Sequence, residues 1–184
     1  MKGKILIVAT LMGLAVMSAV AGMKNPMVGG QEMYPTKNIV ENAVNSADHT
    51  TLVAAVKAAG LVETLEGPGP FTVFAPTNEA FNKLPAGTVD NLLKPENKAT
   101  LTKVLTYHVV AGRLSAHDLM NKIKEGKGKA ELTTVEGGKL WVMLHDGKHI
   151  ELKDEKGGTA LVTIGNVFQS NGVIHVIDSV VMPN

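Results

Sequence analysis

The chain has 184 residues and a formal net charge of +1, from 18 lysines and arginines against 17 acidic residues. It contains no cysteine, which excludes disulfides, thiolate nucleophiles and cysteine metal sites. This balanced charge predicts no nucleic-acid partner, because binding to a phosphate backbone requires an excess of basic side chains. With 45% apolar and 19% charged residues, the composition is that of a folded domain.

The first residues have the pattern of an export signal. Two lysines precede an apolar run over residues 5–16, and the small residues Ala19 and Ala21 then form a cleavage site. We therefore expect a signal peptide over residues 1–21 and a mature protein in the periplasm or outside the cell. The alternative is an uncleaved anchor, because the apolar stretch reaches the lower length limit of a membrane span. No later run has that length, so no transmembrane segment is expected after cleavage.

Residues 22–36 contain glycines and prolines without any periodicity. We expect a flexible lead-in whose ordering would bury little apolar surface. The domain itself is predicted over residues 37–184. Apolar residues at helical spacing predict two short amphipathic helices near its start, one around 39–44 and one over 52–59 that Gly60 ends.

A strand is predicted at 71–75, after a break rich in glycine and proline. Thr77 is expected to cap the next helix, which ends near Lys83. A short helix with apolar residues at 89, 92 and 93 follows, and Pro95 opens a longer one that runs to about Thr106.

The pattern then changes to that of a strand at residues 107–110. Ser115 and Asp118 have the spacing of a capping box, and the helix that they begin is ended by Gly126 and Gly128.

The second half of the chain predicts a sheet. Asp146 and Gly147 have the sequence of a tight hairpin turn, and Gly137 with Gly138 resembles one. Helices followed by strands favour a β-rich α+β domain or a β-sandwich, and the missing strand–helix alternation argues against a parallel nucleotide-binding sheet. The β-like runs are 130–135, 139–145, 149–153, 160–167 and 173–181.

The last of these runs, 173–181, is largely apolar on both faces. A strand of this kind is expected at the centre of a sheet, because an exposed apolar edge would invite aggregation.

Three sequence blocks follow one another in a specific order: FTVFAPTNEAF at 71–81, the Tyr-His pair within LTYHVVAGRL at 105–114, and NGVIHVIDSVVMP at 171–183. Together they resemble the fasciclin domain family, over about residues 37–182. The resemblance implies a twisted β-sandwich or wedge flanked by short α-helices, with the first and last strands in one core. It also implies an adhesion function.

In animal domains of this family, adhesion is assigned to the Tyr-His segment and to an Asp-Ile pair. The resemblance therefore implies a binding role for Tyr107, His108, Val109 and Val110. Their apolar setting favours core packing over direct contact with a partner. The Asp-Ile pair corresponds to Asn166-Val167 here, so the carboxylate is lost and recognition through it is not expected.

The six histidines are the candidate metal ligands or catalytic groups of the chain. His108 and His175 lie in apolar blocks, and hydrogen-bonded core histidines are favoured over a metal pair because no third ligand is near in sequence. His145 and His149 bracket the Asp146-Gly147 turn and are expected to be solvated, with loose metal chelation as the alternative. No nucleophile, phosphate-loop or metalloprotease motif occurs. The sequence predicts no enzyme, no metal site and no cofactor.

We therefore expect an exported, non-enzymatic binding or cell-adhesion module. Its partner would be a surface or envelope protein or a polysaccharide, and self-association is also open. A basic cluster at 122–129 is interpreted as a solvated helix end, with anionic polysaccharide binding as the alternative. The alternative function is a periplasmic small-ligand or metal-binding protein that uses a pocket at the sandwich edge, with His108 and His175.

Overall fold

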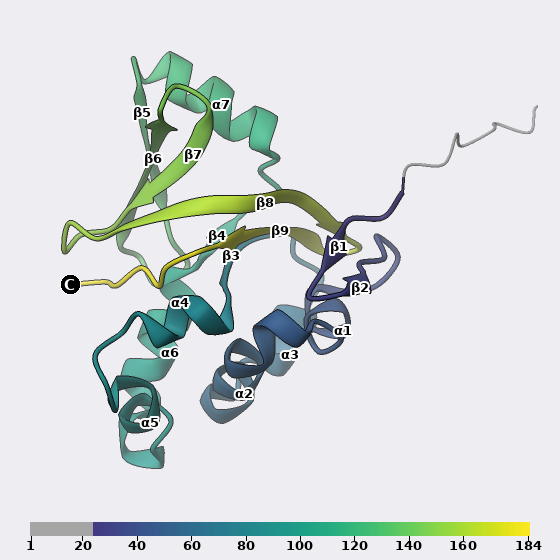
Figure 1. Cartoon of the computed structure of the whole chain (residues 1–184), viewed down its shortest axis with the longest axis vertical. Coiled ribbons are helices and arrows are strands. Elements are labelled where there is room, and N and C mark those ends of the chain that lie inside the picture. Colours follow the sequence, from purple (N-terminus) through teal and green to yellow (C-terminus); the bar gives the residue numbers. More distant parts are fainter. Residues whose placement is uncertain (1–23) are drawn as a thin grey trace, which may run out of the picture.

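The computed structural model describes residues 24–184 (Figure 1). The predicted signal peptide, residues 1–21, lies outside the described residues, and its cleavage stays a prediction. Helices are frequent up to residue 125, and strands dominate from residue 129 onwards. The helix-first, strand-later order expected from the sequence is therefore confirmed within the described chain.

The helices and strands of the described chain are mostly short. The α-helices are α1 (Ile39–Ala43), α2 (Thr50–Ala59), α3 (Val62–Glu66), α4 (Asn78–Asn82), α5 (Thr88–Leu92), α6 (Lys98–Tyr107) and α7 (Ala116–Glu125). The 3-10 helices are η1 (Ala47–His49) and η2 (Pro95–Asn97). The strands are β1 (Met27–Val28), β2 (Gln31–Glu32), β3 (Phe71–Pro76), β4 (Val109–Ala111), β5 (Lys129–Thr133), β6 (Lys139–His145), β7 (His149–Lys153), β8 (Thr159–Gln169) and β9 (Gly172–Ile177).

Strands β3 to β9 form one sheet in the order β4-β3-β9-β8-β7-β6-β5. Neighbouring strands are antiparallel except β3 and β9, which run parallel. The two edge strands approach each other where Val110 bridges Thr134, and the Val135 N–H donates to the Val109 carbonyl at 2.7 Å. The sheet therefore curls into a nearly closed barrel. The expected β-rich α+β fold is confirmed, and its first long strand lies beside its last.

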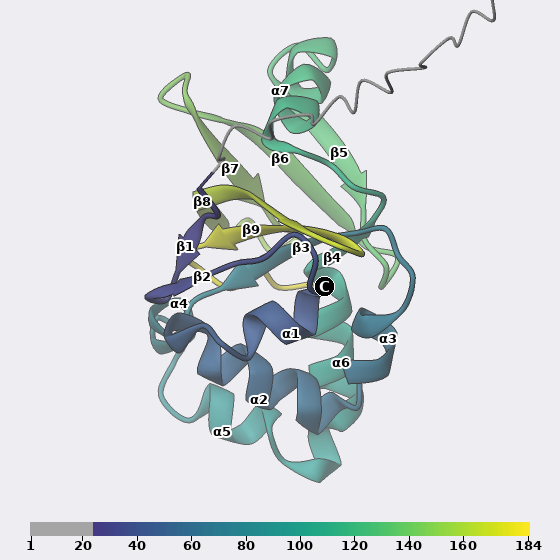
Figure 2. The same cartoon turned by 90° about the vertical axis from the view of Figure 1, so that its right-hand side faces the viewer.

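Helices cover two different parts of this sheet. Helices α1 to α6 gather on the side of β3 and β9, whereas α7 lies over β5, β6 and β7 (Figure 2). The buried apolar residues form two clusters, one for each of these helix groups. The helical-layer cluster includes Leu52, Val56, Val73, Leu105 and Ile174. The α7 cluster includes Leu119, Ile123, Leu140, Val142 and Leu152.

Local sequence signals set several element boundaries. Thr77 Oγ1 accepts a backbone hydrogen bond at 3.2 Å and caps α4, and Ser115 and Asp118 form a reciprocal capping box at α7. In the β6–β7 turn, Asp146 has a φ of 51° and Gly147 a φ of 74°, which is the left-handed backbone that tight hairpin turns require. These three predictions are confirmed.

Strand β9 lies between β3 and β8, and all six of its residues are buried. The prediction that the strand at 173–181 is central is therefore confirmed. Its regular pairing ends at Ile177, before the predicted end at Val181. The following Asp178 accepts a hydrogen bond from the Leu161 N–H at 2.8 Å with its side chain.

The segment before α1 forms a hairpin of β1 and β2. Gly29 and Gly30 turn the chain with φ values of 57° and 76°. Val28 and Met33 are only 5% and 2% exposed and belong to the helical-layer cluster. This differs from the expectation that residues 22–36 would bury little apolar surface, because the glycine turn brings two large side chains into the core.

Candidate functional site

The segment 107–110 lies where the helical layer meets the sheet. Helix α6 ends at Tyr107, His108 is its C-cap, and Val109 and Val110 belong to β4. The predicted strand is therefore wrong for the first two residues. Helical turns continue there, since the His108 N–H donates to the Leu105 carbonyl at 3.1 Å.

The Tyr107 side chain is fully buried. Its hydroxyl donates to the Lys139 carbonyl and accepts from the Glu155 N–H at 3.2 Å. Burial raises the pKa of Tyr107 to about 12. The phenol thus stays protonated at neutral pH and links α6 to β6 and to the loop after β7.

His108 is 2% exposed and uses both ring nitrogens. Nδ1–H donates to the Val104 carbonyl at 2.8 Å, and Nε2 accepts from the Val181 N–H at 3.2 Å. Burial lowers the pKa of His108 to about 4. The ring is therefore neutral at physiological pH, in the tautomer with the proton on Nδ1.

Val109 and Val110, each 5% exposed, enter different clusters because successive strand residues point to opposite faces. The structure thus brings Tyr107, His108, Val109 and Val110 together in the core. None of them presents its side chain to the surface. Their role in binding stays a prediction. In this conformation the four side chains could affect a partner only by supporting the surface residues around them.

His175 in β9 is also buried and doubly bonded. Nε2–H donates to the Leu114 carbonyl at 2.8 Å, and Nδ1 accepts from the Asn166 N–H at 3.4 Å. Burial lowers the pKa of His175. Asn166 in turn accepts from the Ala116 N–H at 2.7 Å and so satisfies a free donor at the start of α7. The preferred interpretation of His108 and His175 as hydrogen-bonded core residues is confirmed.

A third buried histidine, His49, received no role from the sequence. Its Nδ1 accepts from Ser46 Oγ at 2.8 Å, and Nε2–H reaches the Ala75 carbonyl at 3.4 Å. Burial lowers the pKa of His49. Only its apolar neighbours in α2 could have indicated burial, because its partner in β3 is distant in sequence.

The two histidines at the β6–β7 hairpin lie opposite each other and are exposed, as expected. His149 Nδ1 lies 3.0 Å from the Asp146 carboxylate, and His145 Nδ1 lies 3.7 Å from Glu151. The hydrogen bond from His149 lowers the pKa of Asp146. Within residues 24–184, no three histidine or acidic side chains are grouped closely enough to hold a metal ion.

An apolar cavity of about 70 Å³ lies between the sheet and helices α1, α2 and α3. Val73 and Ala75 of β3 and Ile174 of β9 line it on the sheet side. Ala43 of α1 and Val56 of α2 line it on the helix side. Sequence reasoning missed this feature, because apolar periodicity identifies a buried face and cannot distinguish a filled core from a cavity wall.

Comparison with protein families gives a match to the Fasciclin domain over residues 47–183. Protein sll1483 of Synechocystis sp. is 46% identical over 160 residues, which cover 87% of this chain and 81% of that protein. Immunogenic protein MPB70 of Mycobacterium bovis is 39% identical, over 77% of this chain and 66% of that protein. Cell surface glycolipoprotein MPB83 of the same species is 37% identical, over 77% of this chain and 58% of that protein.

Among solved structures, the chain is similar to the FAS1 domain pair of the insect cell adhesion molecule fasciclin I. The TM-score is 0.56 at 23% sequence identity, over 71% of this chain and 43% of that one. At this identity the likeness concerns the fold alone.

Proposed function

Because the chain belongs to the fasciclin domain family, we propose that it is an exported, non-enzymatic binding module of the adhesion type. The observation that carries the proposal is the family match over residues 47–183, on a fold shared with a cell adhesion molecule. The name of one relative, a cell surface glycolipoprotein, supports a place at the cell surface. The proposed partner is an envelope protein or a surface polysaccharide.

The absence of catalysis is proposed from the use of the histidines. His49, His108 and His175 each engage both ring nitrogens with groups of their own chain. A general base needs a nitrogen that can reach substrate. The same bonds give no support to a metal site at His108 and His175.

Export is proposed from the predicted signal peptide. Among the described residues, no helix has the length and apolar character needed to cross a membrane. Mass spectrometry of the protein from the expressing cell is expected to give a start at or near Gly22. Recovery of a chain with intact Met1 from the membrane fraction would contradict export by cleavage.

Binding is tested with the purified protein on a glycan array and in pull-down from envelope extract. The basic cluster is the first surface to vary, because Lys122 and Lys124 lie in the last turn of α7 and Lys127 is exposed beyond it. Changing these three lysines to glutamine is expected to weaken binding to an anionic polysaccharide and to reduce its salt dependence. The pair Lys122→Gln and Lys124→Gln is then compared with the pair Lys94→Gln and Lys98→Gln, on the opposite helical layer, which is the matched control with the same loss of two charges.

If all variants retain one protein partner equally, the binding function is supported and the contact surface for that partner lies away from α7. Retention of no glycan and no envelope component by the wild-type protein would contradict the proposal.

A further inference from the structure

The apolar cavity between the sheet and α1–α3 has a wall without accessible polar groups. Ser46, His49 and His108 line it, but their polar side-chain atoms bond to one another or to the backbone. A polar group placed inside would therefore find no hydrogen-bond partner, at a considerable cost in free energy. The lining therefore suits a hydrocarbon group and disfavours a polar one.

The size of the cavity limits what it holds. Its volume of about 70 Å³ is roughly half of the ~150 Å³ that admits a benzene ring in an engineered apolar cavity. It therefore accommodates the end of a chain and not a whole ring system. The rest of such a molecule would lie in an opening.

The half-buried lining residues locate that opening. Val40, Val53 and Val62 come from α1, α2 and α3 respectively, and each is partly accessible to solvent. One opening thus lies where these three helices meet. The exposed Val135, which follows β5, marks a second accessible place along the wall. A hydrocarbon chain that passes between the three helices would bury the solvent-accessible surface of Val40, Val53 and Val62, and burial of apolar surface favours binding.

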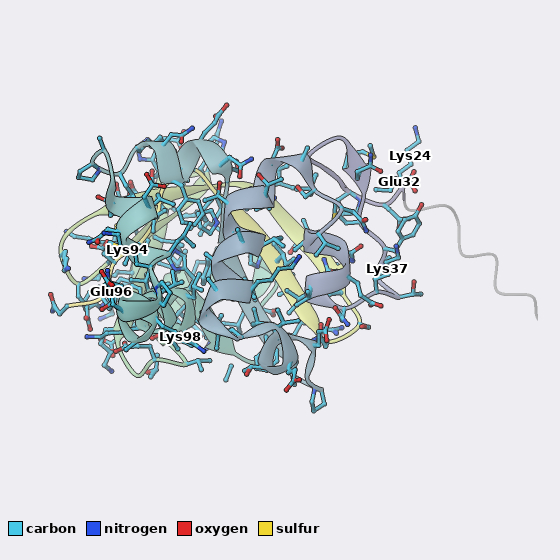
Figure 3. The ribbon with its side chains drawn as sticks, turned by 90° about the horizontal axis from the view of Figure 1, so that it is seen from below. Lys24, Glu32, Lys37, Lys94, Glu96 and Lys98 are labelled. Carbon is cyan, nitrogen blue, oxygen red and sulfur yellow. The ribbon has the colours of Figure 1, made fainter. Side chains whose placement is uncertain are left out.

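Among the described residues that line the cavity, Lys57 is the one with a permanently charged side chain. It is exposed in the last turn of α2, and no carboxylate of residues 24–184 lies within 4 Å of its ammonium. Seen from the helical side (Figure 3), α1 and α2 run between two groups of mixed charge, Lys24 with Glu32 and Lys37, and Lys94 with Glu96 and Lys98. Both groups are of mixed sign. Exposed Glu41 of α1 and Glu63 of α3 lie on the same helices but do not line the cavity, so Lys57 is the charge that the lining itself offers.

We propose that this cavity binds the hydrocarbon tail of an anionic amphiphile, such as a fatty carboxylate, with the head group beside Lys57. The proposal does not depend on the proposed adhesion function, because it rests on the cavity lining and Lys57 and not on the family match. A free fatty acid and an acidic lipid share this chemistry. A soluble carboxylate and vesicles that contain an anionic lipid distinguish the two sources.

The first experiment measures binding of decanoate, below its micelle concentration, by calorimetry and by the shift in melting temperature. The expected result is saturable binding with a higher melting temperature for the wild-type protein. Ala43→Leu adds volume to the cavity wall and should weaken binding at least about tenfold, while Ala54→Leu on the exposed face of α2 should bind as the wild type does. If Ala43→Leu fails to fold, Val53→Phe at the opening serves the same purpose.

The second experiment tests the head group. Lys57→Gln should weaken decanoate binding roughly two- to fivefold, as expected for an exposed ion pair. It should leave decanol binding unchanged, and Lys57→Arg should restore decanoate. Lys94→Gln is the control with the same loss of charge.

Three results would overturn the proposal. They are no saturable binding of either decanoate or anionic vesicles by the wild-type protein, equal binding by wild type and both cavity-filling variants, or tighter binding of decylammonium than of decanoate. If Ala43→Leu raises the melting temperature and no amphiphile binds the wild type, the cavity is a packing defect. Binding of vesicles but not of free decanoate would assign the site to a lipid, and the same filled variants should then lose it.

Discussion

His108 Nε2 accepts a hydrogen bond from the Val181 N–H at 3.2 Å, across 73 residues of sequence. The other nitrogen of the same ring donates to Val104 in α6. One imidazole therefore joins the end of a helix to the segment that follows the last strand of the described sheet. Both contacts are to the backbone, so the link requires the ring and tolerates side-chain variation at its partners.

Replacement of His108 with alanine should affect stability more than binding. The Val181 N–H would remain buried without an acceptor, which costs about 1–3 kcal/mol in the free energy of unfolding. Thermal unfolding and a binding curve for the folded variant separate the two effects. His117→Ala, at an exposed position in the first turn of α7, is the control and should change neither. An unchanged melting temperature with abolished binding would instead assign His108 to recognition.

The protein should lose stability as the pH falls from about 6.5 to 4. Burial lowers the pKa of His108 from 6.5 to about 4, so in this range the unfolded chain binds a proton that the folded protein does not. The contribution of neutral His108 to the free energy of unfolding is therefore complete above pH 6.5, the pKa in the unfolded chain. By pH 4 about 3 kcal/mol of it is lost. The lowered pKa values of His49 and His175 act in the same direction. Urea unfolding measured across this range provides the check, and a profile for His108→Gln as steep as that of the wild type would contradict the assignment.

Removal of β9 should prevent folding. A chain that ends at Asn171 lacks the strand between β3 and β8 and leaves two apolar strand edges open. Ile177→Asp places an unpaired charge at a fully buried position and should be nearly as damaging. Circular dichroism and limited proteolysis report the result. A cooperative, protease-resistant fragment would show that β9 is dispensable.

Gly29→Ala should destabilise the protein more than Gly30→Ala. Both glycines have a positive φ, but a Cβ at Gly29 would collide with Ser46 Oγ and the backbone N of Ala47, whereas a Cβ at Gly30 has open space. The additional loss expected from overpacking is about 1–3 kcal/mol. Chemical denaturation of both variants measures the difference. Equal destabilisation would mean that the hairpin of β1 and β2 is not firmly docked on η1.

Features that depend on neighbouring residues could be predicted from the sequence. The Ser115–Asp118 capping box and the Asp146-Gly147 turn each lie within a few residues, and their geometry follows from local backbone requirements. Helix α3 was missed because its five residues directly precede a stretch rich in glycine and proline that dominates the local pattern.

Features that join distant segments could not be predicted. The closure at Val110 and Thr134 and the partner of His108 depend on which segments meet in space, which the hydrophobic pattern does not specify. Burial of His108 followed from its apolar neighbours, but its acceptor role toward Val181 did not. The family resemblance supplied the overall architecture and could not supply the cavity, whose existence depends on how tightly a few valines and alanines fill one space.

The parallel pairing of β3 with β9 joins residues 71–76 to residues 172–177. A chain that emerges from the ribosome with its amino terminus first must therefore hold β3 without its partner until nearly the whole domain has been synthesised. Contacts this remote in sequence also make folding slow. Under the export proposed above this delay would be useful, because a polypeptide that has not yet folded is the form that can pass through a secretion channel. The order of the strands postpones completion of the domain until β9 has been synthesised, which is compatible with the proposed export.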